Sequence, residues 1–342
     1  MQTEAKQNRG NSRNSALDGI RALSAVGILL MHVYTNGGYR LTGFVFENMI
    51  PSFTNLVFLF MIVSGYAMCC GYYDRIMGNQ VSVGEFYGRR FQKIWPFFAF
   101  WSLVDLVLAP SKTALYEVFA NLTLCFGLLP NAEISVIGVG WFIGLVFVFY
   151  LAFPFFCYLL SDKKRAWLSF AVALIFNYLC TVRFQANRTN IVYSAVFFLA
   201  GGLLFLYKEQ LGWVARKCKW AIFLAIAAMC CVYYLFGGYV PVMLALFSLM
   251  VVYTMDKEGK YWLLSNRVTA FLGGISLEVY LCHMIAFRLL EKIGVTHLFA
   301  SQLLSFVCTA AATLVGAVVL SVVVKKLLQL VEGIFRRMFS KK

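Results

Sequence analysis

Long apolar stretches, separated by short polar loops, occupy almost the whole chain. Several of them approach or exceed the roughly 20 residues that an α-helix needs to cross a bilayer. The pattern predicts an all-α, polytopic transmembrane helical bundle of about ten spans, with an N-terminal tail at 1–16, a membrane domain at 17–324 and a basic C-terminal tail at 325–342. We place the spans near residues 17–36, 51–72, 94–110, 138–160, 166–183, 190–207, 219–236, 238–254, 268–289 and 298–324.

The composition also indicates a membrane protein. Of the 342 residues, 61% are hydrophobic and only 13% are charged, which excludes an ordinary soluble protein. Lys6, Arg9 and Arg13 precede the first stretch as in a signal peptide, but no small-residue cleavage site follows it, so we expect an uncleaved first span. Most of the ten cysteines fall within spans and no Cys-x-x-Cys pair occurs, so we expect small buried thiols and no bound metal.

The basic residues determine the expected orientation. The formal net charge is +15, and in a soluble protein it could suggest a nucleic-acid partner. Here the Lys and Arg side chains lie in short loops, where they set topology. With a cytoplasmic N-terminus, the tails and inner loops hold 23 of them and the outer loops hold 6. We therefore expect both termini in the cytoplasm and no nucleic-acid binding.

One further segment, 114–129, is apolar enough to be an eleventh span. If it crossed the membrane, the later basic loops and the C-terminal tail, with 16 Lys and Arg residues, would lie outside. We therefore interpret it as an interfacial or re-entrant helix.

Two ionisable residues lie in the first span. Arg21 and His32 are eleven positions apart, almost three helical turns, so their side chains share one face about 16 Å apart along the axis. Ionisable groups inside a membrane helix are costly and suggest a function. Histidine could serve as a general base near neutral pH or as a nucleophile. The alternatives are a helix-end imidazole satisfied by a neighbour and an interfacial arginine paired with Asp18.

Four other polar residues are candidates to support this pair. His283 should lie at a depth similar to that of His32, and Asp105 in the outer third of its span; either could orient the imidazole. Glu278 should lie near mid-membrane, where a carboxylate must find a partner or stay protonated. Ser64 precedes a glycine in the second span, a pattern that more often indicates close helix packing than chemistry.

The segment 84–94 is amphipathic, with Arg89 and Lys93 pointing away from its apolar face and Arg90 flanking them. These cations could act only in topology and in contact with anionic membrane lipids. They could also bind the phosphates of a ligand that arrives from the cytoplasm, because the forked donors of arginine suit phosphate.

Five stretches in order resemble the acyltransferase-3 family of multi-pass membrane acyltransferases. The first joins Arg21 and His32, with ten residues between them. The others are LFMIVSGY at 59–66, FYGRRFQKIWP at 86–96, WFIGLVFVFYLAFP at 141–154 and ISLEVYLCH at 275–283. The chain departs from the family pattern at Phe58, Val146 and Phe147, where many members have an acidic residue, and at Lys93, where arginine is usual. These departures bear on the acceptor more than on the reaction type.

The resemblance implies an O-acyltransferase of the bacterial cytoplasmic membrane. It implies transfer of an acyl group, most often acetyl, from acetyl-CoA to a hydroxyl of a cell-surface or lipid-linked glycan. His32 and Arg21 would be catalytic. The nucleotide of CoA would dock near Arg89, Arg90 and Lys93, and its pantetheine arm would follow a continuous channel along the first span. The alternative is a transporter or flippase in which His32 and Glu278 form a proton relay.

Overall fold

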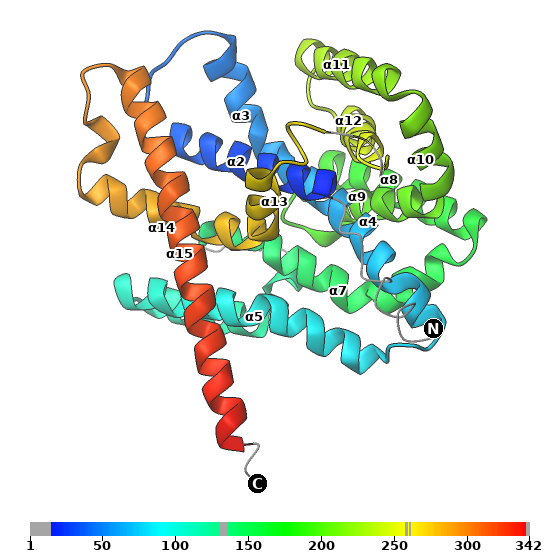
Figure 1. The fold of residues 1–342 in the computed structure, drawn as a ribbon, viewed down its shortest axis with the longest axis horizontal. Helices are drawn as coiled ribbons and strands as arrows, with labels where there is room; N and C mark the ends of the chain where they lie inside the picture. The colour runs from blue at the N-terminus through cyan, green and yellow to red at the C-terminus, as the bar shows by residue number, and fades with distance from the viewer. Residues whose placement is uncertain (1–14, 130–135, 257–258, 260, 340–342) are drawn as a thin grey trace, which may run out of the picture.

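The computed structural model describes residues 15–129, 136–256, 259 and 261–339, and this part of the chain is helical without a strand (Figure 1). The α-helices are α2 (Ser15–Asn36), α3 (Ile50–Ser52), α4 (Leu56–Met77), α5 (Val83–Leu108), α6 (Lys112–Thr123), α7 (Trp141–Leu160), α8 (Lys163–Val182), α9 (Ile191–Leu206), α10 (Lys208–Lys217), α11 (Lys219–Phe236), α12 (Val240–Tyr253), α13 (Arg267–Gly274), α14 (Ser276–Lys292) and α15 (Gln302–Phe339). Short 3-10 or π segments cover Val45–Met49, Phe53–Asn55, Cys125–Leu128, Gly138–Gly140 and Val295–His297. The expected all-α membrane bundle is confirmed.

Seven helices of the described chain are long and apolar enough to cross a membrane, and the count rises to nine if two bent helix pairs each form one span. The shorter α12 occupies the place of the expected span at 238–254. Its 14 residues extend only about 21 Å, less than the roughly 30 Å of a hydrocarbon core.

One of the expected spans, 268–289, is interrupted, and a second sharp bend lies at the end of the expected span 190–207. The axes of α9 and α10 differ by 77°, and those of α13 and α14 by 79°. The expectation of one continuous helix over 268–289 is therefore wrong. The break follows Gly273, where a Cβ atom would overlap the backbone carbonyl of Asp18, and the Ser276 hydroxyl donates a hydrogen bond to the Gly273 carbonyl (3.0 Å). Because only glycine allows this approach, the break is anchored directly on α2.

The segment 114–129 does not form a spanning helix. The helix α6 starts after Ser111, whose hydroxyl accepts a hydrogen bond from the Ala114 amide, and has 12 residues, about 18 Å. It ends at Leu124, which has left-handed backbone angles (φ 58°) and leads into a short 3-10 turn. This length supports the interpretation of 114–129 as a segment that does not cross the bilayer.

Helix α2 lies in the middle of the bundle (Figure 1) and is its most enclosed long helix, with 72% of its best apolar window buried. Beside it, α4 and α9 pack backbone to backbone. A Cβ atom at Gly65 would overlap the carbonyl oxygen of Phe198, and one at Gly201 that of Ile62. The close helix packing that we expected from the glycine after Ser64 is therefore confirmed.

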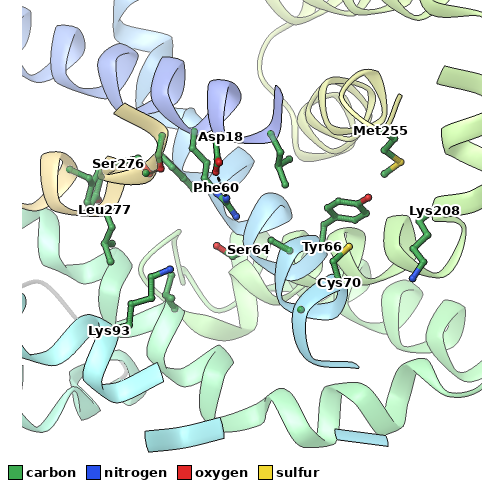
Figure 2. A pocket seen from close by; sticks show the side chains of 18 of the residues that line it. Asp18, Phe60, Ser64, Tyr66, Cys70, Lys93, Lys208, Met255, Ser276 and Leu277 are labelled. Carbon is green, nitrogen blue, oxygen red and sulfur yellow. Dashed lines mark hydrogen bonds and ion pairs between the residues drawn. The ribbon is translucent and has the colours of Figure 1, made fainter. Parts of the chain in front are cut away.

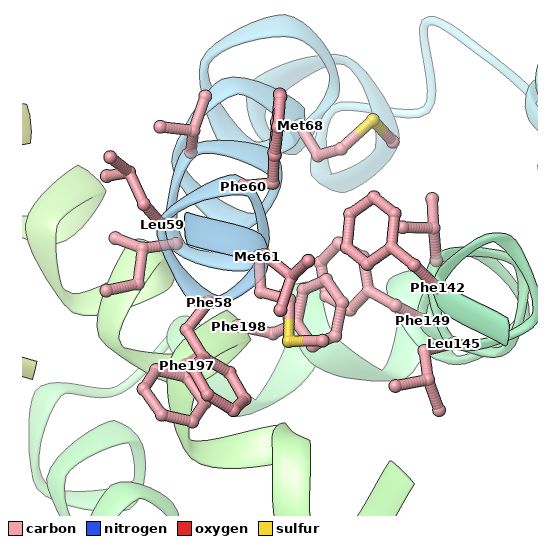
Figure 3. Close-up of a cluster of buried hydrophobic side chains, with 14 of the residues drawn as sticks. Phe58, Leu59, Phe60, Met61, Met68, Phe142, Leu145, Phe149, Phe197 and Phe198 are labelled. Atoms are coloured by element: carbon pink, nitrogen blue, oxygen red, sulfur yellow. The ribbon is translucent and has the colours of Figure 1, made fainter. Parts of the chain in front are cut away.

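Stacked aromatic rings fill the space around this crossing (Figure 3). Phe58 stacks on Phe197 at 4.2 Å, and Phe149 stacks on Phe198 at 4.3 Å. Rings of this size bury a large apolar area and hold their neighbours in fixed rotamers. The rigid α4–α7–α9 layer thus fixes one wall of the interior.

Helix α15 passes α14 and α5 and extends beyond the rest of the bundle (Figure 1). It continues without a break to Phe339, so the helix does not end at residue 324. The first residue of the expected basic tail, Lys325, lies within this helix.

Candidate functional site

Two cavities lie along α2. The large cavity has a volume of about 1000 Å³, and the small cavity one of about 190 Å³. Arg21 lines the large cavity and His32 lines the small one, so both side chains face the protein interior. The first span therefore presents its two ionisable residues to two different compartments.

Tyr280 of α14 lines both cavities. It is buried, and its hydroxyl donates a hydrogen bond to the Val139 carbonyl at 2.9 Å. In place of one continuous channel beside the first span, the described structure has two compartments that share this side chain.

Basic side chains from three helices line the large cavity. They are Arg21 of α2, Lys93 of α5, and Lys208 and Arg216 of α10. Figure 2 shows Lys93 and Lys208 on opposite sides, with Ser64 of α4 between them. The 77° bend after α9 brings α10 to this wall. Three carboxylates, those of Asp18, Glu209 and Glu278, also line this cavity, so its lining carries a small positive formal charge that suits an anionic ligand.

Acidic side chains balance part of this charge. Arg21 Nη1 lies 2.9 Å from Asp18 Oδ1, the pairing expected one turn earlier in the same helix. Glu278 of α14 forms an ion pair with Lys325 of α15, with Oε1 and Nζ 2.5 Å apart. The Glu278 carboxylate, which we expected near mid-membrane, is thus paired with a cation 47 residues later in the chain.

The three cations of the amphipathic segment 84–94 lie in different environments. Lys93 lines the large cavity. Arg90 donates to the Tyr72 hydroxyl at 2.6 Å and lies over that ring, 4.7 Å from its centroid. Arg89 forms an ion pair with Glu85 on the exposed side of α5. Only Lys93 can touch a ligand in the cavity directly.

Two of the three histidines, His32 and His283, meet beside the small cavity, which His32 lines. The ring centroids of His32 and His283 are 5.1 Å apart, with the planes inclined by 43°. His283 is buried, and its Nδ1 lies 2.7 Å from the Tyr280 carbonyl oxygen. Because a carbonyl only accepts, Nδ1 carries the hydrogen. The other nitrogen, Nε2, is a buried acceptor without a hydrogen-bond partner among the described residues.

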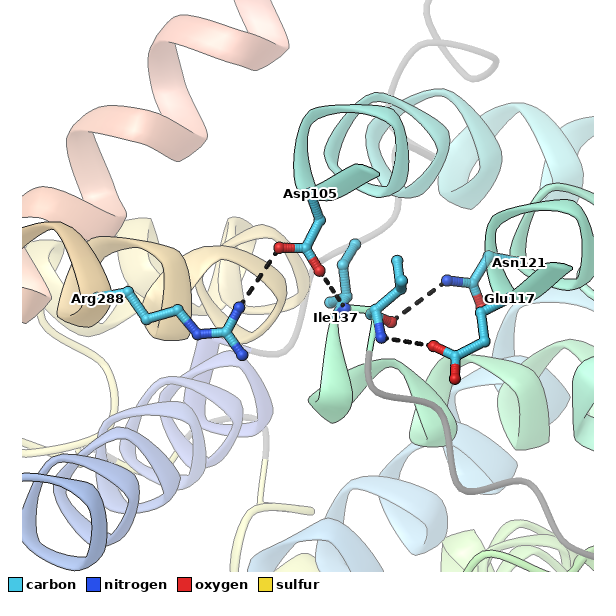
Figure 4. Close-up of polar contacts among 6 residues, drawn as sticks. Asp105, Glu117, Asn121, Ile137 and Arg288 are labelled. Atoms are coloured by element: carbon cyan, nitrogen blue, oxygen red, sulfur yellow. Dashed lines mark hydrogen bonds and ion pairs between the residues drawn. The ribbon is translucent and has the colours of Figure 1, made fainter. Parts of the chain in front are cut away.

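Asp105 lines the small cavity but is engaged elsewhere (Figure 4). Its carboxylate accepts hydrogen bonds from the Ile137 amide at 3.1 Å and from Arg288 at 3.4 Å. Of the two candidates to orient His32, the structure brings His283 into ring contact, whereas Asp105 binds Ile137 and Arg288, which line the same cavity.

Several lining residues were missed from the sequence. Lys208, Arg216 and Arg188 were counted only as topology signals. Lys325, which pairs with the lining residue Glu278, was assigned to the tail. Tyr280 was quoted within a motif without a role. The one available signal was the pair of glycines at 273–274, which marks the turn that aims α14 at α2.

Comparison with curated proteins and with solved structures gave no significant match to this chain. A family model described as an acyltransferase domain matches residues 14–322, which span both cavities and nearly every described helix. This match confirms the resemblance carried by the five motifs. The protein is a multi-pass membrane protein, and its chain belongs to the acyltransferase-3 family.

Proposed function

We propose that this membrane acyltransferase moves an acetyl group from acetyl-CoA to a hydroxyl of a cell-surface or lipid-linked glycan, in a bacterial cytoplasmic membrane. The observation that carries the proposal is the placement of His32 beside His283 at one cavity, with Arg21 on the same helix at a second, basic cavity. One helix thereby connects a compartment suited to an anionic donor with one suited to proton transfer.

The large cavity is the proposed donor site. Its volume of about 1000 Å³ lies at the upper end of the range for ligand pockets. The cations Arg21, Lys93, Lys208 and Arg216 would attract the phosphates of CoA, and arginine adds paired hydrogen bonds. The excess of inner Lys and Arg residues supports a cytoplasmic entrance to this cavity.

His32 is the proposed general base. A ring nitrogen of His32 takes the proton of the acceptor hydroxyl while that oxygen forms a bond to the thioester carbonyl carbon. When the carbon–sulfur bond breaks, His32 returns the proton to the leaving thiolate, which departs as the free thiol. The acceptor is thereby acylated, and His32 regains its neutral form. A brief acyl-histidine intermediate would use the same residue as nucleophile.

His283 is the proposed positioning residue. The free Nε2 acceptor of its ring can take a hydrogen bond from His32 when His32 carries the extra proton. The Tyr280 carbonyl fixes the tautomer of His283 from the other side. An acceptor that holds and stabilises an imidazolium is the role the third member plays in catalytic triads.

The test uses membranes from cells that make the protein and radiolabelled acetyl-CoA. Wild-type membranes should label the glycan fraction, and His32→Ala should reduce the initial rate by about 10²–10⁴-fold or more without loss of protein from the membrane. His297→Ala is the matched control, because His297 lies in an exposed loop and lines neither cavity. Unimpaired transfer by His32→Ala would refute the mechanism.

The structure supports the proton-relay alternative less well. A relay needs carboxylates that can take up and release protons, whereas Glu278 is held in an ion pair with Lys325.

A further inference from the structure

The small cavity contains a cation that the acyl-transfer mechanism does not use. Arg188, in the loop before α9, lines this cavity together with His32. Its Nη1 lies 2.5 Å from the Thr54 hydroxyl oxygen, and its guanidinium carbon is 5.6 Å from the centre of the Trp141 ring. The other arginine of the cavity, Arg288, is bound to Asp105. Within the described part of the chain, Arg188 contacts no carboxylate.

The surrounding loop holds Arg188 in this position. The Ser194 hydroxyl donates to the Arg188 carbonyl at 3.0 Å, and the Asn187 side chain accepts from both the amide and the hydroxyl of Thr189. These contacts fix the backbone on each side of the arginine, so its guanidinium is positioned before a ligand arrives.

The position also argues against a purely structural role. Arg188 lies three residues before the first residue of α9, where the helix dipole is positive and disfavours a cation. Beyond the hydroxyl of Thr54 and the ring of Trp141, the described residues supply no acceptor for most of the five N–H donors of the guanidinium. An anion in the small cavity, which Arg188 lines, would satisfy these donors.

We propose that the small cavity binds the acceptor through an anionic oxygen group, a carboxylate or a phosphate, that is held by the Arg188 guanidinium. The inference rests on the proposed function, since it assigns the acceptor to the cavity of His32. Arginine binds both groups through two parallel hydrogen bonds. The indole of Trp141 supplies a flat apolar surface for a sugar ring beside them, and His32 lies within the same 190 Å³.

The test measures ligand binding to the purified full chain in detergent, by the shift in its thermal unfolding temperature across ligand titrations. The probes are glucose, glucuronate and glucose 1-phosphate, which share a sugar ring and differ in charge. Wild type should bind at least one charged sugar about tenfold or more tightly than glucose. The preferred anion tells whether the acceptor group is a carboxylate or a phosphate.

Arg188→Gln should abolish this preference, and Arg188→Lys should keep part of it because the charge remains. Arg183→Gln is the matched control, since Arg183 is exposed in the same loop and lines neither cavity. If Arg188→Gln fails to fold, the graded loss in Arg188→Lys decides the question. Equal binding of all three sugars by wild type, or a preference that survives in Arg188→Gln, would overturn the proposal.

The binding measurement needs no acyl transfer, so its outcome does not depend on whether the proposed function is correct. A charged-sugar preference without any acetyl transfer would remove the enzyme mechanism and leave the anion site. If Arg188→Gln slows transfer to every acceptor equally and binding shows no preference, the guanidinium stabilises the reaction's own oxyanion, and the assigned acceptor class is wrong.

Discussion

The imidazole rings of His32 and His283 lie 5.1 Å apart, one on α2 and the other on α14, although 251 positions separate them in the chain. The contact depends on the break between α13 and α14. The helix α13 meets α2 at Asp18, and α14 brings His283 to His32 near the other end of α2. A buried, neutral histidine with a free acceptor nitrogen is thereby placed against the histidine that faces the small cavity.

Replacing His283 should slow catalysis without removing the base itself. His283→Ala should lower kcat by about 10- to 100-fold, a range typical of residues that orient a reacting imidazole. His283→Gln should recover part of this loss because the amide oxygen can accept the same hydrogen bond. Initial rates of labelled acetyl transfer, with KM for acetyl-CoA measured in parallel, would check this.

A rise in KM at unchanged kcat in both His283 variants would contradict the positioning role. Equal losses in His283→Ala and His283→Gln, together with a lowered unfolding temperature, would instead indicate that His283 only fills space.

Substitutions of two cations of α5 should differ in their effect on KM for acetyl-CoA. Lys93→Met should raise KM for acetyl-CoA by about tenfold, because Lys93 lines the large cavity and would lose a charged contact to phosphate. Arg89→Gln should leave KM nearly unchanged, because Arg89 is paired with Glu85 outside the cavity. Titration of acetyl-CoA against both variants gives the comparison. A larger effect of Arg89→Gln would show that the nucleotide docks on the exposed face of α5.

The sequence predicted the bundle, the non-spanning segment at 114–129 and the shared inward face of Arg21 and His32 on the first span, because apolar length, charge bias and helical spacing are local quantities. It could not predict the partner of Glu278, since Lys325 lies 47 positions away and follows an apolar stretch like any tail residue. It also missed Arg188, because a cation in a loop gives the same topology signal whether it faces water or a cavity. The break after Gly273 depends on an approach to Asp18 that no local pattern contains.

The α4–α9 crossing should tolerate no side chain at its contact point. Gly65→Ala would place a methyl group against the Phe198 carbonyl and should destabilise the protein by about 1–3 kcal/mol. Gly71→Ala, in the same helix with open space around it, should be neutral or stabilising by up to about 1 kcal/mol. Thermal unfolding in detergent compares the two, and equal stability of both variants would contradict the close packing.

The ion pair between Glu278 and Lys325 should show energetic coupling. Glu278→Gln and Lys325→Met should each destabilise the protein, and the double variant should be less unstable than the sum of the two. Because Lys325 is 42% exposed and Glu278 is 15% exposed, a coupling of about 1–3 kcal/mol is expected, between the values for surface and buried pairs. Additive effects on the unfolding free energy in this double-mutant cycle would show that the pair contributes nothing.

The most direct test asks whether the acetyl group crosses the membrane beside α2. Radiolabelled acetyl-CoA, which does not cross membranes, is added to inverted vesicles whose cytoplasmic face points outward. We expect label in glycan that is enclosed in the lumen and protected from an added esterase. This label should be lost in His32→Ala and retained in His297→Ala. Label found only on glycan at the outer face of these vesicles, or equal luminal label in His32→Ala, would contradict this expectation.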